Sequence, residues 1–369
     1  MCNNNPILQD ISNWFAKHFS DPEALALFFT LLFGFLLIEF FGQYLLPVAI
    51  SVVVAYLFAS PVRWLKRWYL PHWLAVTVVY IFFLGLFLLA LFGFLPLMWK
   101  QLVGMIHEFP RAVNRGQAWM TDLARRYPKF FPANPLDNVA AYLQDQSARI
   151  GRFILSFSLS SIPGFIEIIL YFILVPLLIF FFLKDGSTIS HWLSHFLPER
   201  RGLIRIVWHE MNQKIGAYVR GRVIEILIVS VVAVIAFATL GLQYAFLLGV
   251  LLGLSVIVPY IGAIIVTIPI AIVSLMQWGL LSPHFAYLMI VYSVIITLDG
   301  NLLVPLLFSG AMDLHPIMII LSVLVFGGIW GFWGVFFAIP LATLIKTVLN
   351  AWPKPGSGDL EKKRNVVRF

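Results

Sequence analysis

An acid, a glycine and an amide stand together inside an apolar stretch of the sequence, at Leu298-Asp299-Gly300-Asn301. An ionisable group within a membrane span is costly to hold there, so it is a functional candidate by default. Asp299 could carry a proton or a cation, or it could cap a helix half at the membrane edge, and the residues favour neither interpretation. Gly300, Asn301 and the following Pro305 are candidates for the same substrate or ion pathway.

The apolar stretch 249–269 contains a second candidate site, because Pro259 and Gly262 interrupt a helix there. A break leaves backbone N–H and C=O groups without helical partners. Apolar surroundings tolerate such groups only where the backbone is buried in protein or lines a watery cavity. Secondary transporters build their sites where half-helices meet. Pro259, Tyr260 and Gly262 are therefore predicted to line the pathway, in a segment that either crosses once or forms a re-entrant hairpin.

Two further acids and one loop are weaker candidates. Glu39 lies deep in the first predicted span and has no basic neighbour in sequence. Glu225 follows Arg220 and Arg222, which favours an interfacial salt bridge over a role in the pathway. In the loop before the last span, His315 could respond to pH near neutrality, although a histidine beside a proline is more often structural. The loop candidates are Asp313, His315 and Pro316.

Small residues recur where helices are expected to pack closely. Gly249 and Gly253 belong to a stripe with one small residue every four positions, which lets helices approach each other in a membrane. Helix packing is the default role for such glycines, and pore lining is the less favoured alternative. The predicted packing or gating residues are Gly249, Gly253, Gly327, Gly328, Gly331, Gly334 and Pro340.

Motifs for catalysis are missing from the sequence. The single cysteine excludes an internal disulfide and a cysteine-based metal cluster. His209 begins a pattern like that of a zinc-protease helix, but Gln213 replaces the second histidine. The sequence contains neither G-x-S-x-G nor the phosphate loop GxxxxGK[ST]. We therefore expect no enzyme activity, no metal and no cofactor, and any transport must be driven by a gradient or a partner.

The composition predicts a membrane protein. Of the 369 residues, 61% are hydrophobic and 11% charged, against about 25% charged residues in soluble domains. The mean hydropathy is +0.92. The basic residues that give a net charge of +8 lie beside the apolar runs, where they act as topology signals and contact anionic lipid head groups. Nucleic acid is not an expected partner.

We predict an all-α polytopic protein with about eight transmembrane helices, a broken or re-entrant helix near 249–269 and a small extracytoplasmic helical insert. Residues 42–43 form a tight hairpin between the first two spans. The loop 61–72 has three basic residues and no acid, which is a cytoplasmic signal and places both termini in the cytoplasm. The predicted spans are 24–41, 44–60, 73–99, 162–183, 223–240, 245–277, 285–307 and 317–348.

Four regions follow from these spans. Residues 1–99 comprise an N-terminal amphipathic segment and the first three spans, and residues 100–161 form the extracytoplasmic insert. Residues 162–350 form the transport core with the last five spans and cytoplasmic amphipathic helices. Residues 351–369 are a basic cytoplasmic tail.

Six motifs in one order resemble a known family. They are FFLKDG at 181–186, Arg220-Gly221, VPYIG at 258–262, DGNLLVP at 299–305, LHP at 314–316 and GxxGxxxxxIPLATLIK at 331–346. Together they resemble the autoinducer-2 exporter-like family of bacterial inner-membrane proteins, and its permease branch in particular. The resemblance implies about eight spans, an extracytoplasmic insert and homo-oligomers, with pentamers as one option. It also implies export of a signalling molecule or sodium–proton exchange.

Two departures from the family pattern concern the candidate sites. Ala263 stands where many members have a proline, and Asp299 stands where many have a glutamate. The acid is retained with a shorter side chain, which leaves coupling feasible and changes its geometry.

Three functions remain open from the sequence. The favoured one is a gradient-driven transporter that exports a small polar solute. The second is a cation–proton antiporter with Asp299 as carrier, aided by Glu39 or Glu225. The third is a membrane scaffold that docks envelope proteins on its insert. A scaffold role gives no reason for a broken span beside an intramembrane acid. Expected partners are membrane lipid, a small solute or cation, and further copies of the chain.

Overall fold

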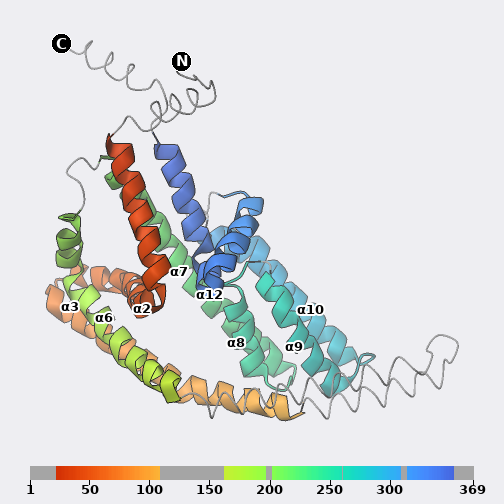
Figure 1. Ribbon diagram of the computed structural model, residues 1–369. Coiled ribbons are helices and arrows are strands. Elements are labelled where there is room, and N and C mark those ends of the chain that lie inside the picture. The colour runs from red at the N-terminus through yellow and green to blue at the C-terminus, as the bar shows by residue number, and fades with distance from the viewer. Residues whose placement is uncertain (1–21, 109–161, 197–201, 260, 309–313, 353–369) are drawn as a thin grey trace, which may run out of the picture. The chain divides into compact units, whose positions relative to one another are not determined.

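The computed structural model describes residues 22–108, 162–196, 202–259, 261–308 and 314–352 (Figure 1). Within these ranges every regular element is a helix. Eight helices are long and apolar enough to cross a membrane, which confirms the predicted all-α polytopic fold. The predicted N-terminal amphipathic segment, most of the insert, Tyr260, Asp313 and the tail beyond residue 352 lie outside the described ranges.

The helices cover most of the described chain, and two of them continue through π-helical turns, labelled η. In order, the elements are α2 (Pro22–Arg67), α3 (His72–Leu89), η1 (Ala90–Phe94), α6 (Ile162–Ser194), α7 (Gly202–Thr239), α8 (Ala245–Ser255), α9 (Ile261–Trp278), α10 (Pro283–Leu298), η2 (Asp299–Leu303), α11 (Val304–Phe308) and α12 (Pro316–Ala351).

Two helices begin with the same local signal. Ser282 accepts a hydrogen bond from the His284 N–H at the start of α10, and His315 Nδ1 accepts one from the Ile317 N–H at the start of α12. Each of these caps precedes a proline at the first helical position, where a missing N–H is harmless. The structure thus gives His315 a capping role.

The chain forms two compact units, each built from segments far apart in sequence. The first unit contains Met1–Val76, Leu177–Arg220 and Gly310–Phe369. The second contains Thr77–Pro176 and Gly221–Ser309. The helices α3, α6 and α7 each contribute residues to both units.

In the first unit, α2 doubles back on itself. Leu27 packs in a buried cluster with Met211 of α7, and the Tyr56 hydroxyl donates to the Asn212 carbonyl at 2.7 Å. A straight helix would separate Leu27 from Tyr56 by roughly 44 Å, although their partners on α7 are adjacent. The chain therefore turns between them, as the hairpin predicted at residues 42–43 requires, and the two candidate spans end and begin there.

A second reversal, which sequence reasoning missed, lies inside α12. Gly331 has φ 59° and ψ −136°, a conformation outside the helical region. A Cβ on Gly334 would overlap the Phe326 carbonyl, and one on Gly327 would stand 2.8 Å from a methyl carbon of Val335. Eight residues of straight helix would span about 12 Å. The two halves of α12 therefore fold against each other at Gly331.

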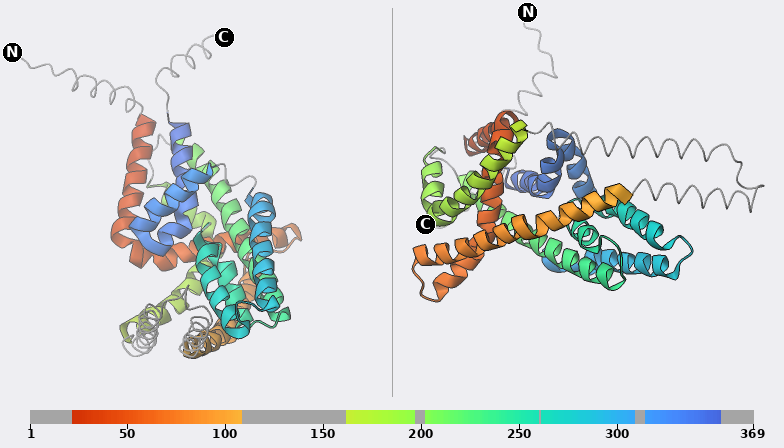
Figure 2. Two further views of the ribbon diagram at one scale, coloured as in Figure 1. Left: turned by 90° about the vertical axis from the view of Figure 1, so that its right-hand side faces the viewer. Right: turned by 90° about the horizontal axis from the view of Figure 1, so that it is seen from below.

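In the second unit, α8 and α9 form an antiparallel hairpin, which Figures 1 and 2 show from three directions. The Gln277 side chain, at the end of α9, accepts from the Gln243 N–H at 2.8 Å and donates to the Gly241 carbonyl at 2.7 Å. These bonds join the end of α9 to the residues before α8. With 11 residues, α8 extends only about 16 Å, too short for a hydrocarbon core of ~30 Å. The apolar segment therefore reverses and does not cross as one helix.

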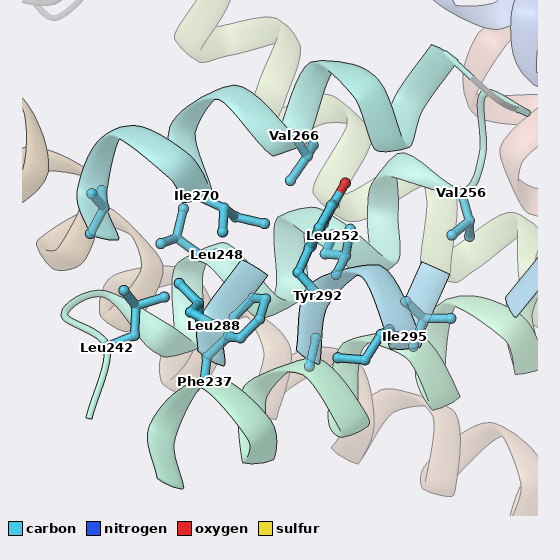
Figure 3. Close-up of a cluster of buried hydrophobic side chains, with 13 residues drawn as sticks. Phe237, Leu242, Leu248, Leu252, Val256, Val266, Ile270, Leu288, Tyr292 and Ile295 are labelled. Carbon is cyan, nitrogen blue, oxygen red and sulfur yellow. The ribbon is translucent and has the colours of Figure 1, made fainter. Parts of the chain in front are cut away.

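Close packing holds this hairpin on α7. A Cβ on Gly249 would stand 2.6 Å from the Val234 backbone nitrogen, and one on Gly253 would overlap the Ser230 hydroxyl. In lipid, van der Waals packing and hydrogen bonds favour helix association more than the hydrophobic effect does. The buried side chains of α7, α8, α9 and α10 interdigitate in one cluster (Figure 3). Its members are Val229, Ala233, Phe237, Leu242, Leu248, Leu252, Val256, Val266, Ile270, Val273, Leu288, Tyr292 and Ile295.

The reversal in α12 predicts that Gly331 and Gly328 respond differently to alanine. At Gly331 a side chain would be held at a strained backbone conformation, so Gly331→Ala should lower stability by about 1–3 kcal/mol. At Gly328 an added Cβ meets no atom within 4 Å, so Gly328→Ala is the matched control and should not destabilise. Thermal unfolding of the purified variants in detergent checks this. Equal melting temperatures for the two variants would contradict the reversal.

Candidate functional site

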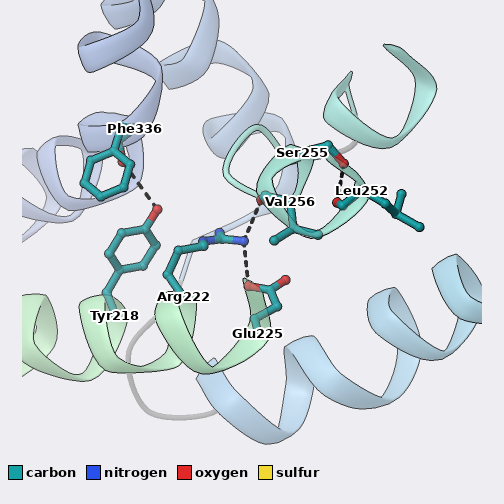
Figure 4. A network of polar contacts seen from close by, with 7 residues as sticks. All are labelled: Tyr218, Arg222, Glu225, Leu252, Ser255, Val256 and Phe336. Carbon is teal, nitrogen blue, oxygen red and sulfur yellow. Dashed lines mark hydrogen bonds and ion pairs between the residues drawn. The ribbon is translucent and has the colours of Figure 1, made fainter. Parts of the chain in front are cut away.

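A buried ion pair lies on α7, at its entry into the second unit. Arg222 donates from one terminal nitrogen to Glu225 Oε2 at 2.7 Å, one helical turn apart (Figure 4). The two residues are only 4% and 1% exposed. Sequence reasoning expected Glu225 to pair at the membrane interface. The pair forms, but protein encloses both side chains, so the charges depend on each other rather than on solvent.

The same guanidinium binds the break between α8 and α9. Its nitrogen Nη1 donates to the Val256 carbonyl at 2.7 Å, and Val256 directly follows the last residue of α8 (Figure 4). The last carbonyls of a helix have no partner within that helix. Arg222 supplies one, and its central carbon also lies 5.0 Å from the centroid of the Phe308 ring, a cation–π distance.

Asp299 completes the cluster as a second carboxylate. The charge of Arg222 acts on Asp299, and that of Asp299 acts on Glu225. The Oδ1 atom of Asp299 is shielded from solvent and accepts no hydrogen bond within the described part of the chain. Arg222 pairs directly with Glu225, and its charge also acts on Asp299, so one negative charge is left over when both acids are ionised. A buried uncompensated charge is expensive, so the cluster favours a bound proton or cation.

A widened helical turn places Asp299. The Val304 N–H bonds to the Asp299 carbonyl, the spacing of a π-helix, and such single turns are frequent at functional sites. Asn301 donates from its side chain to the Thr297 carbonyl at 2.9 Å. Gly300, Asn301 and Pro305 are exposed. Asp299 ends α10 and begins η2 with helical backbone angles, so the helix continues through it.

The predicted break residues directly follow Val256, the backbone partner of Arg222. The Pro259 carbonyl accepts from the Ile261 N–H at 2.7 Å, and the Gly262 N–H donates to the Val258 carbonyl at 2.9 Å. Gly262 is buried, and a Cβ there would overlap the Ser255 carbonyl. Only a glycine lets α9 start this close to the end of α8. The structure thus brings together the break, Glu225 and Asp299, three features that the sequence presented separately.

Other predicted residues lie elsewhere. Glu39 is exposed in the first unit and accepts a hydrogen bond from the Trp330 ring nitrogen at 3.0 Å. Pro340 is buried in α12, and Pro316 begins that helix. No group of three or more metal-ligating side chains was found among the described residues.

Sequence reasoning named Arg222 only as a salt-bridge neighbour of Glu225, without its contact to the break, and it missed Phe308. Arg222 stands next to Arg220-Gly221, so its charge looked like part of a topology signal. The available clue was the spacing Arg-x-x-Glu inside an otherwise apolar helix, because residues three apart lie on one face. Phe308 carried no signal, since its contact depends on Gly221, where a Cβ would come within 2.9 Å of the Phe308 ring.

The family profile of AI-2E family transporters matches residues 25–354. The chain belongs to the AI-2E transporter family. This confirms the resemblance seen in the motifs.

Relatives in the AI-2E family are named as permeases or transport proteins. The chain is 44% identical over 347 residues to the permease PerM of Escherichia coli (strain K12), which covers 94% of this chain and 98% of PerM. It is 28% identical over 324 residues to the transport protein YueF of Bacillus subtilis (strain 168), covering 84% of each. Membership and these names agree with a non-enzymatic membrane protein.

The buried pair predicts a non-additive effect on stability. Arg222→Met removes the partner of a buried carboxylate and should destabilise by about 3–5 kcal/mol. The double variant Arg222→Met with Glu225→Leu removes both charges and should recover part of that loss. Thermal unfolding in detergent measures both variants.

Lys214→Met provides the control, because Lys214 also pairs with an acid of α7 but the side chains are 24% and 40% exposed. Its effect should stay below about 1 kcal/mol. If the double variant recovered none of the stability lost in Arg222→Met, the charges would not be coupled.

Proposed function

We propose that this AI-2E family member is a gradient-driven transporter that moves a small polar solute across the bacterial inner membrane, outward and with both termini cytoplasmic. The observation that carries the proposal is the Arg222 guanidinium, which binds the broken backbone at Val256 and a buried carboxylate at once. A packed scaffold needs neither group. A pathway needs a polar site whose backbone can be held and released.

The contacts of Arg222 offer a way to couple a bound ion to the hairpin. One nitrogen of Arg222 donates both to Glu225 and to Val256. A proton or cation on Glu225 or Asp299 weakens the pull of that carboxylate on Arg222. The guanidinium is then freer to change its contact with the α8–α9 break. An ion that binds one arrangement of the hairpin more tightly than another shifts the population toward the first.

A second candidate, cation–proton antiport, is favoured by the excess of carboxylate in the same cluster. Two acids and one base can exchange a proton for a monovalent cation without a net change of buried charge. Asp299 is then the carrier, because its Oδ1 has no hydrogen bond to lose within the described residues. The sequence has no nucleotide-binding phosphate loop, which fits a driving force from a gradient.

Flux in proteoliposomes tests both candidates. The purified protein is reconstituted with a trapped pH dye, and sodium or potassium gradients are applied in each direction. We expect cation-dependent proton movement whose rate falls at least about tenfold in Asp299→Asn. A tenfold change corresponds to a loss of ~1.4 kcal/mol in the free energy of ion binding. Glu210→Gln, which neutralises an acid paired with Lys214 in the first unit, should keep the flux of the unaltered protein.

The outcomes separate the functions. Proton movement that survives in Asp299→Asn removes Asp299 as the carrier. If no cation moves protons, antiport is excluded, and labelled small polar metabolites are tested in the same vesicles. If these do not move either, transport is overturned in favour of a scaffold.

A further inference from the structure

In the first unit, α2 and α7 each carry a stripe of residues, polar except for Gly216, and the two stripes meet at Tyr56. On each helix they recur at spacings of three or four residues, so they share one face. The stripes are Tyr56, Ser60 and Arg63 on α2, and Asn212, Gly216 and Arg220 on α7.

Direct contacts join the two stripes at Tyr56. Its hydroxyl lies 2.7 Å from the Asn212 carbonyl and 2.6 Å from the Asn212 side-chain oxygen. A Cβ on Gly216 would stand 3.2 Å both from Tyr56 Cζ and from a terminal nitrogen of Arg220. The missing side chain at Gly216 therefore lets the Tyr56 ring and the Arg220 guanidinium meet over α7.

A second guanidinium approaches from α2. Arg63 donates to the Ser60 hydroxyl at 3.0 Å, which turns its head group back along the helix toward Tyr56. The positive charges of Arg220 and Arg63 both act on the Tyr56 hydroxyl. Within the described residues, neither guanidinium forms an ion pair with an acid. Two cations that converge without a counter-charge repel each other unless an anion lies between them.

The surroundings place this cluster at the depth of lipid head groups. Arg63 lies near the end of α2, whose last turn carries Lys66 and Arg67. Trp64 and Trp68 are 56% and 66% exposed, and their rings are 5.3 Å apart. Exposed tryptophans and basic residues at the end of an apolar span are typical of the membrane interface. The anion that fits here is carried by lipid.

We propose that Arg220 and Arg63, beside the Tyr56 ring, bind the phosphate group of an anionic phospholipid. The half-buried Arg220 forms the inner wall of the site, and the exposed Arg63 closes it from the α2 side. The planar guanidinium suits this role, because its donors match two phosphate oxygens at once. The residues of this site belong to the first unit, and those of the transport cluster belong to the second.

The test measures lipid preference in the purified full-length protein. Energy transfer from tryptophan to dansyl-labelled lipid reports binding of phosphatidylglycerol or of zwitterionic phosphatidylcholine. The unaltered protein should prefer phosphatidylglycerol. Arg220→Gln and Arg63→Gln should each reduce that preference about fivefold. This is the change in affinity expected when one basic residue is removed from an anionic lipid surface. Arg205→Gln, an exposed charge on the same helix, should leave it unchanged.

Several results would overturn the proposal. Equal binding of the two lipids by the unaltered protein would overturn it. An equal loss of phosphatidylglycerol preference in Arg205→Gln would also overturn it, because it would show unspecific electrostatic attraction. Displacement of phosphatidylglycerol by millimolar inorganic phosphate would show a site for free anions. Should Arg220→Gln fail to fold, Arg63→Gln alone decides, because its exposed side chain donates one hydrogen bond within the described residues, to Ser60. An unchanged preference in Arg63→Gln rejects the site.

Discussion

The hydrogen bond from Arg222 to the Val256 carbonyl is the contact on which the second unit depends. A helix that stops inside apolar surroundings leaves carbonyl groups that only protein or water can satisfy. Here a guanidinium reaches across from α7 and satisfies one of them at 2.7 Å. Because that guanidinium also pairs with Glu225 and its charge acts on Asp299, the broken backbone, a buried acid and a half-buried acid all depend on one cation.

Close approach of the helices makes this reach possible. Gly249 and Gly253 let α8 lie directly on α7, and Gly262 lets α9 begin against the end of α8. A larger residue at any of these positions would move the break away from Arg222. The glycines therefore act on the polar cluster indirectly, because they set the distance between the helices. Helix packing in this unit thus determines whether Arg222 can reach the break.

Much of the fold follows from the sequence, because lipid allows few alternatives. Long apolar runs must be helical there, so the spans and the turn at residues 42–43 could be predicted. Asp299 could be singled out for the same reason, since a charge in an apolar run has few structural roles. These predictions need only local composition.

The parts that could not be predicted depend on contacts between distant residues. Gly331 alone among the glycines of α12 adopts a positive φ, and its neighbours Gly327, Gly328 and Gly334 look the same in sequence. Arg222 looked like one of several basic residues near a span. Its role appears only when the α8–α9 hairpin places Val256 within reach.

Water access to the α8–α9 break is the property that a transport role requires most directly. It can be measured after Cys2→Ser, with single cysteines introduced at Val258, Asn301 or Ile264 and a membrane-impermeant maleimide added to either side of sealed vesicles. Val258 and Asn301 flank the charged cluster, whereas Ile264 is 68% exposed on an apolar face of α9. We predict labelling at positions 258 and 301 and protection by lipid at position 264. Protection of both 258 and 301 from either side would contradict a pathway at the break.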